Sequence, residues 1–201
     1  MVDVAARLRA RAEIAGVALS DELSSGLLRY LEVLTLWNRR MNLTAFDLSV
    51  PGDEAIDRLL VEPVAAAALV PAGACRALDI GSGGGSPALP LALASGFTEQ
   101  LLVEARAKKA AFLREAVRTL GVPGRVEAVR VEDLSAAEDG GFDLISLRAV
   151  RADAGLWLAI DRLLAPGGRV LWFGGVGHTA KTVMVQCGSI GVTIALERRV
   201  S

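Results

Sequence analysis

The chain has 201 residues, of which 52% are hydrophobic and 22% charged, and its formal net charge is −1. This apolar content excludes intrinsic disorder, and two cysteines exclude a disulfide scaffold. The longest apolar stretch, residues 64–75, is shorter than the roughly 20 residues of a membrane-spanning helix. Charged side chains interrupt the N-terminus where a signal peptide would be apolar. We therefore expect a cytoplasmic protein that makes no membrane contact.

The first 70 residues have the spacing of helices. Apolar side chains recur on one helical face after residue 20, at Leu23, Leu27, Tyr30, Leu31 and Leu34. Ser20 is the expected N-cap of this helix, which should end near residues 37–40. A second helical stretch covers about residues 53–69, and Pro63 should bend or divide it. We predict a helical extension over residues 1–70.

From residue 71 onward, short apolar runs alternate with helical stretches. The expected strands cover residues 77–80, 100–104, 126–129, 142–147, 169–173 and 191–200. The expected helices cover residues 89–94, 108–120 and 154–164. This alternation predicts an α/β fold with a doubly wound, mostly parallel, Rossmann-like sheet over residues 71–201.

A glycine-rich turn follows the first expected strand and has the spacing Gly81, Gly83, Gly85. A dinucleotide-binding fingerprint would carry its third glycine at position 86, where this chain has Ser86, and this disfavours a nicotinamide-dependent oxidoreductase. The spacing suits S-adenosylmethionine, which has no pyrophosphate. Asp79 would orient this ligand through its ammonium group, or through backbone amides and water. The alternative is an ordinary tight turn.

Two acidic positions follow the next strands. Glu104 ends the second expected strand, where a carboxylate would accept hydrogen bonds from both ribose hydroxyls of an adenosyl group. Val131 and Glu132, with Asp133, follow the third strand, where an adenine ring would lie. The alternative for Glu104 is a surface acid beside Arg106 and Lys108. The alternative for Glu132 and Asp133 is that they are ordinary acids of a surface loop.

Cations supply the remaining candidates. Arg148 follows the fourth expected strand and would bind a phosphate, a guanine edge or the methionine carboxylate; a strand-end salt bridge is the alternative. Seven cations and two acids lie between residues 106 and 130, and Arg106, Lys108 and Lys109 are the candidates for RNA phosphates. Solvated helix charges are the alternative there. His178 is the single histidine, so we expect no metal site.

Five motifs together resemble one family, the bacterial 16S rRNA guanine-N7 methyltransferases called RsmG or glucose-inhibited division protein B. The resemblance covers about residues 20–175. Its motifs are W-N-x-x-M-N-L-T at 37–44, D-I-G-S-G-G-G-S-P at 79–87, K-K-A-A-F-L at 108–113, R-V-E-D at 130–133, and F-D with S-L-R-A at 142–149.

The resemblance implies a class I S-adenosylmethionine-dependent methyltransferase that modifies one guanine N7 near the decoding region, in free 16S rRNA or in the 30S subunit. It implies cofactor binding by a set of residues shared with the motifs: Gly81, Gly83, Ser86, Glu104, Val131, Glu132 and Arg148. We expect a monomer.

This chain departs from the family pattern at three places. Residues 58–62, from Arg58 to Glu62, replace an H-x-x-D-S segment. Gly174 and Gly175 stand where the family has lysine and glycine. The chain also ends before the family's last strand pair is complete. These departures would weaken rRNA binding or catalysis, or mark a different substrate.

Guanine N7 carries a lone pair and no proton, so its methylation needs no general base and depends on alignment and electrostatics. This chemistry fits a site without a catalytic histidine, and the chain has only His178, in a glycine-rich segment. Two alternatives stay open: a methyltransferase acting on a small molecule or protein, and a non-catalytic module that binds S-adenosylmethionine or rRNA.

Overall fold

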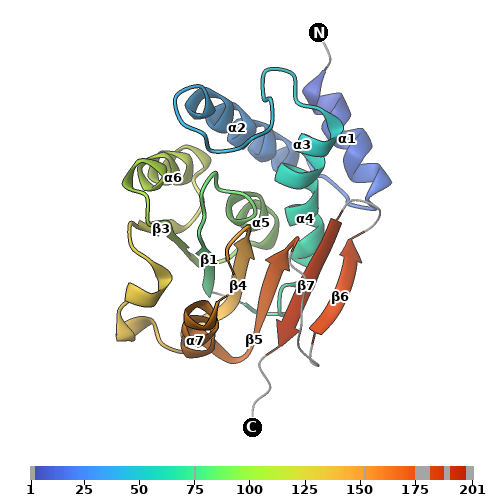
Figure 1. The fold of residues 1–201 in the computed structure, drawn as a ribbon. Helices are drawn as coiled ribbons and strands as arrows, with labels where there is room; N and C mark the ends of the chain where they lie inside the picture. The colour runs from blue at the N-terminus through green and yellow to red at the C-terminus, as the bar shows by residue number, and fades with distance from the viewer. Residues whose placement is uncertain (1–2, 75, 152, 175–181, 188–190, 198–201) are drawn as a thin grey trace.

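A seven-stranded sheet forms the centre of the computed structural model (Figure 1), which describes residues 3–74, 76–151, 153–174, 182–187 and 191–197. The strands are β1 (Arg76–Ile80), β2 (Glu99–Val103), β3 (Gly124–Glu127), β4 (Phe142–Arg148), β5 (Leu164–Phe173), β6 (Thr182–Cys187) and β7 (Gly191–Glu197). Their order is β3-β2-β1-β4-β5-β7-β6. β1 to β5 pair in parallel, whereas β7 is antiparallel to β5 and β6. The predicted mostly parallel α/β sheet is confirmed, and β6 is an addition to it.

Helices cover both faces of the sheet (Figure 1). They are α1 (Val4–Ile14), α2 (Asp21–Asn38), α3 (Asp53–Ile56), α4 (Glu62–Ala66), α5 (Ala88–Ser95), α6 (Ala107–Leu120) and α7 (Ala154–Leu163). Leu78 and Ile80 of β1 pack in one core with α7, whereas Ala77 packs in another with α4 and α5. Alternate strand residues therefore face opposite helical layers, as the two-residue period of a strand requires. None of the described helices is long and apolar enough to cross a membrane.

The N-terminal helices are built into the core on the face of α5 and α6. Ser20 caps α2 by accepting a hydrogen bond from the Leu23 amide at 3.1 Å, as predicted. Leu27 and Leu34 of the α2 stripe are fully buried in one cluster with Phe112 of α6. Because this core is shared, the helices support the sheet directly, and the boundary near residue 70 stays a prediction.

Pro63 changes the hydrogen bonding of the segment at 53–69. The helix continues through it, but a π-helical turn, Asp57–Val61, lies between α3 and α4, and Ala67–Leu69 forms a 3-10 turn. The Glu62 amide donates to the Asp57 carbonyl, in the wider π pattern. Pro63 has no N–H to donate to the Leu59 carbonyl four residues before it, and the Glu62 amide is not directed at the Arg58 carbonyl. Both carbonyls accept hydrogen bonds from side chains outside the helix.

Two strands differ in position from the predictions. β3 covers Gly124–Glu127 rather than 126–129, because its pairing with β2 begins where Gly124 lies opposite Gln100. Val126 and Val129 mark an apolar run in the sequence, but the limits of the strand are set by its pairing with β2. β5 begins at Leu164 rather than 169, since Leu164 already pairs with Phe142, and α7 consequently ends at Leu163.

We predict that Gly85→Ala destabilises the fold by about 2–3 kcal/mol. The φ of Gly85 is +86°, and a Cβ there would lie 2.7 Å from Cδ1 of the buried Leu89. Gly96→Ala is the matched control, because Gly96 has a φ of +65° and no atom within 4 Å of the added Cβ. It should cost only about 1 kcal/mol, from backbone strain. Urea unfolding of both variants measures the difference, and equal costs would contradict the packing argument.

Candidate active site

A pocket of about 380 Å³ opens at the carboxyl ends of β1, β2 and β3, beside the start of α7. In a doubly wound sheet, ligands bind at this edge. The pocket lining includes the ends of the strands and the loops that follow them: Ile80, Gly81, Val103, Glu104, Ala105, Val129, Arg130, Val131, Glu132, Val150, Arg151, Asp153 and Leu156. Its walls are apolar where the strands end and charged at the rim. This combination suits an aromatic ring joined to a polar sugar.

Four of the residues predicted to bind the cofactor line this pocket together: Gly81, Glu104, Val131 and Glu132. Gly81 has a φ of +70°, and a Cβ added to it would lie 2.9 Å from Cγ2 of Val150. Glycine is therefore required here by both conformation and space. The side chain of Val131 is buried at the pocket wall, and Glu132 is exposed at its rim.

Glu104 connects the glycine turn to the end of β2. Its carboxylate accepts a hydrogen bond from the Gly83 amide at 3.0 Å through Oε2, and one from the Arg106 amide at 2.8 Å through Oε1. The residue is buried. A carboxylate has about four acceptor positions, so two backbone donors fix the group and leave acceptor capacity for a ligand.

The remaining glycine-turn candidates lie outside the pocket lining. Gly85 is buried against Leu89 and Tyr30, so its environment is that of a packing residue. The Ser86 hydroxyl donates to the Leu59 carbonyl at 2.9 Å, the carbonyl that Pro63 leaves without its α-helical donor. These contacts give both residues a role in holding the turn. Their predicted contact with the cofactor stays a prediction.

Asp79 lies beneath the turn and does not line the pocket. It is 1% exposed, and its Oδ1 accepts a hydrogen bond from the Ser146 hydroxyl at 2.5 Å. Burial raises the pKa of Asp79 to about 6, against the opposing effects of Ser146 and Arg148. Its Oδ2 has no hydrogen-bond partner in the part of the chain that the structure describes. Any orienting effect of Asp79 on a ligand therefore passes through the backbone or water.

Arg148 forms the strand-end salt bridge that the sequence left as its alternative role. Its guanidinium donates to Oε2 of the fully buried Glu62 at 2.7 Å and to the Arg58 carbonyl, and it lies 4.9 Å from the centre of the Phe173 ring. Burial lowers the pKa of Arg148 and raises the pKa of Glu62. The opposite charge of each residue acts against the pKa shift of its partner. Sequence reasoning missed Glu62, although a carboxylate beside a proline in an apolar helix is a signal for a buried partner.

The three candidate RNA-binding cations lie where α6 begins, directly after β2. Arg106 and Lys108 are exposed, and Lys109 is partly buried. The Lys109 ammonium lies 3.9 Å from the point that a Cβ on Gly83 would occupy. These cations therefore lie near the strand edge that holds the pocket.

The W-N-x-x-M-N-L-T motif supports the glycine turn from the opposite side. The Asn38 side chain accepts hydrogen bonds from the amides of Leu43 and Thr44, at 2.9 and 3.1 Å. The Leu43 carbonyl oxygen lies 3.0 Å from where a Cβ on Gly84 would be, and the Tyr30 hydroxyl donates to the Gly84 carbonyl at 2.8 Å. The motif thus acts through packing on the turn.

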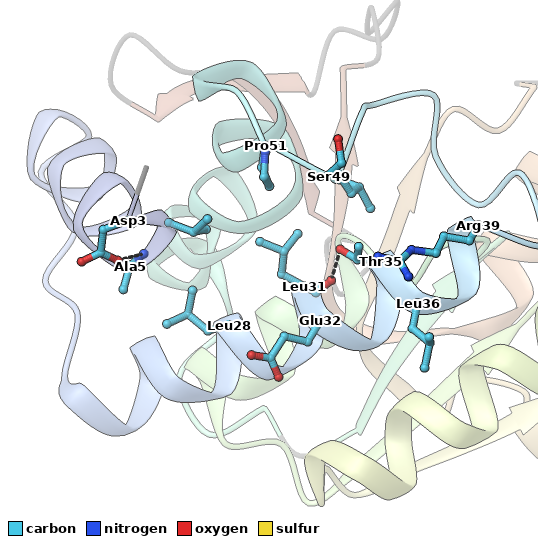
Figure 2. A pocket seen from close by; sticks show the side chains of 12 residues that line it. Asp3, Ala5, Leu28, Leu31, Glu32, Thr35, Leu36, Arg39, Ser49 and Pro51 are labelled. Carbon is cyan, nitrogen blue, oxygen red and sulfur yellow. Dashed lines mark hydrogen bonds between the residues drawn. The ribbon is translucent and has the colours of Figure 1, made fainter. Parts of the chain in front are cut away.

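A second pocket, of about 420 Å³, lies between α1, α2 and the segment around Pro51 (Figure 2). None of the predicted site residues lines it. His178 and Gly175 lie outside the described residues. Within the described part of the chain, no group of three or more His, Cys, Asp or Glu side chains has a metal-binding arrangement.

Comparisons with known proteins settle the family. The model of the family described as "rRNA small subunit methyltransferase G" matches residues 24–184. The chain belongs to this family. A ribosomal RNA small subunit methyltransferase G of Stenotrophomonas maltophilia is 39% identical over 81% of this chain and 74% of its own length, and one of Xanthomonas axonopodis is 37% identical over 79% and 72%. The resemblance seen in the motifs is confirmed.

Solved structures agree on the fold. A candidate S-adenosylmethionine-dependent methyltransferase of Methanococcus maripaludis superposes with a TM-score of 0.59 at 15% identity, over 85% of this chain and 93% of its own. The predicted methyltransferase class and its cofactor, S-adenosylmethionine, are supported by family and fold together. The lining of the pocket fits the adenosyl part of this cofactor, because it joins an apolar wall to the Glu104 carboxylate.

We predict that Glu104→Gln weakens S-adenosylmethionine binding about tenfold or more, because an amide can accept only through its oxygen and loses the charge-assisted hydrogen bonds. Isothermal titration calorimetry measures the dissociation constant. Glu127→Gln, a partly buried acid in the neighbouring strand, is the control. Equal affinities of the two variants would remove Glu104 from the binding site.

We also predict a pH-dependent stability difference between the wild type and Asp79→Asn. The folded-state pKa of Asp79 is about 6, above the ordinary value of 3.8. Between these two pH values the native state holds a proton that the unfolded state has lost. Wild-type stability from this group is therefore full below pH 3.8 and is lost as the pH rises through 6. The variant should gain on the order of 2–3 kcal/mol relative to wild type between pH 4 and 7. Urea unfolding at several pH values tests this, and a constant difference would contradict it.

Proposed function

We propose that the protein transfers the methyl group of S-adenosylmethionine to N7 of one guanine in 16S rRNA. The observation that carries the proposal is the convergence of Gly81, Glu104, Val131 and Glu132 on one pocket at the carboxyl ends of the strands. Membership in the rRNA small subunit methyltransferase G family supports the substrate class.

Each pocket residue has a role in this proposal. The Glu104 carboxylate accepts from the ribose hydroxyls, and Val131 and Glu132 border the adenine ring. Gly81, together with Gly83 in the turn beside the pocket, gives the methionine part a backbone surface without side chains. When bound, S-adenosylmethionine supplies an electrophilic methyl group. The residues of the chain bind and align, and none has to remove a proton because guanine N7 carries none.

Arg148 is proposed to position the methionine carboxylate or the guanine edge. Its Nε is buried and has no hydrogen-bond partner among the described residues, while its other nitrogens contact Glu62 and the Arg58 carbonyl. A buried donor without a partner is costly, and a bound acceptor would satisfy it. This supports a role beyond the salt bridge.

The partner and location follow from the substrate. We propose that Arg106, Lys108 and Lys109 contact rRNA phosphates, that the substrate is 16S rRNA alone or within the 30S subunit, and that the protein is a cytoplasmic monomer. The exposure of Arg106 and Lys108 near the pocket edge supports the contact.

The direct test is methyl transfer from labelled S-adenosylmethionine to 30S subunits that lack the modification, followed by mapping of the modified base. We expect label at one guanine N7. Label on protein or on small molecules instead would favour the alternative substrates. Cofactor binding without transfer to any ribosomal substrate would favour a non-catalytic binding protein.

In the same assay, Arg148→Lys should lower kcat/KM by about 100-fold, because lysine keeps the charge opposite Glu62 but lacks the planar fork. Arg162→Ala is the control: Arg162 is also ion-paired, with Asp139, on the opposite side of the sheet. Thermal unfolding shows whether each variant is folded. A folded Arg148→Lys enzyme with wild-type kcat/KM would exclude this role.

A further inference from the structure

A buried carboxylate between two arginines lies at the ends of β4 and β5. Glu62 has no exposed surface, and its Oε2 lies 2.7 Å from Nη2 of Arg148 and 3.5 Å from Nη1 of Arg58. Its Oε1 has no hydrogen-bond partner among the described residues. Two cations and one anion leave this cluster with an excess positive charge.

The two arginines differ in what they can still bind. The Arg148 side chain is 14% exposed and makes the short contact with Glu62, whereas that of Arg58 is 34% exposed and makes the longer one. Arg58 has five N–H donors in a planar fork, and in the described part of the chain its side chain has this one ion pair. Arg58 is therefore the cation with donors available to an incoming group.

Gly174 makes room for this arginine. A Cβ on Gly174 would lie 3.1 Å from Nη2 of Arg58, so the guanidinium lies against the end of β5 because no side chain stands there. The helix segment before α4 thus places a cation at the edge of the sheet where β5 ends.

The position of the cluster separates it from the adenosyl pocket. That pocket is lined by the ends of β1, β2 and β3 and by the loop after β4, and its lining contains none of Arg58, Arg148 and Gly174. These three residues gather at the ends of β4 and β5. Under the proposed function the cofactor occupies one half of the edge, which leaves the other half for the methyl acceptor. A π-helical turn presents Arg58 there, and such turns occur often at functional sites.

We infer that Arg58 is a substrate-binding residue that pairs with an rRNA phosphate next to the target guanine, and that Glu62 is the positioning residue that holds Arg58 and Arg148 toward the substrate. This inference rests on the proposed function. An arginine fork matches a phosphate in geometry as well as charge. Its partial exposure fits a large ligand that arrives from solvent.

The test compares Arg58→Ala with Arg162→Ala, whose side chain is 30% exposed and ion-paired on the opposite side of the sheet. The 30S affinity is measured by filter binding over a range of KCl concentrations at constant magnesium. We expect Arg58→Ala to bind about tenfold more weakly. The salt slope should fall by about 0.7–0.9, the value for one lost phosphate contact. Arg58→Lys should retain most of the slope, and Arg162→Ala all of it.

The cofactor affinity of the same variants distinguishes the roles. S-adenosylmethionine binding to Arg58→Ala should stay within twofold of wild type, and a large loss would move Arg58 to the methionine carboxylate and overturn the inference. A salt slope equal to that of Arg162→Ala would also overturn it. Glu62→Gln should raise KM for 30S subunits more than it changes cofactor affinity. If wild-type protein binds no 30S subunits at all, the proposed function itself fails.

Discussion

Interrupted helical hydrogen bonding around Pro63 is the constraint on which the site depends. Pro63 leaves the Leu59 carbonyl without its α-helical donor, and the Glu62 amide donates to Asp57 rather than to Arg58. Two residues from the strand edge bind these carbonyls: Arg148 donates to that of Arg58 and Ser86 to that of Leu59. The helix segment is thereby fastened to the end of β4 and to the glycine turn. The same segment carries Glu62 and Arg58, so these two contacts place the buried ion pair. A non-proline residue at 63 would supply an N–H that competes with Ser86 for the Leu59 carbonyl.

The glycine turn is held from three directions. Tyr30 of α2 donates to its Gly84 carbonyl, Glu104 of β2 accepts from its Gly83 amide, and Ser86 is tied to the segment before α4. The N-terminal helices therefore help to shape the cofactor site although they contribute no residue to the pocket at the strand ends. This explains why the motif around Asn38 accompanies the glycine motif in the sequence: its loop packs on the same turn.

The parts that local rules govern could be predicted from the sequence. The cap at Ser20, the stripe of α2 and the convergence of Gly81, Glu104 and Val131 follow from helical period, capping and the geometry of parallel strands. The parts set by tertiary contact could not. The limits of β3 depend on its pairing with β2, and the π-helical turn depends on partners brought from β4. The environments of Asp79 and Gly85 depend on a helical layer whose packing no spacing in the chain reveals.

Charge conservation limits what the arginines can do in the reaction. Methyl transfer from a sulfonium to guanine N7 moves one positive charge onto the base and creates none. A cation without an anion beside it would therefore oppose the product if it were held at the ring, whereas a cation on a phosphate stabilises reactant and product alike. Arg148 has the Glu62 carboxylate at 2.7 Å to offset its charge, and Arg58, with the longer contact to Glu62, suits the phosphate. In the proposed reaction the rate comes from alignment, and the charges of the site hold the substrate in place.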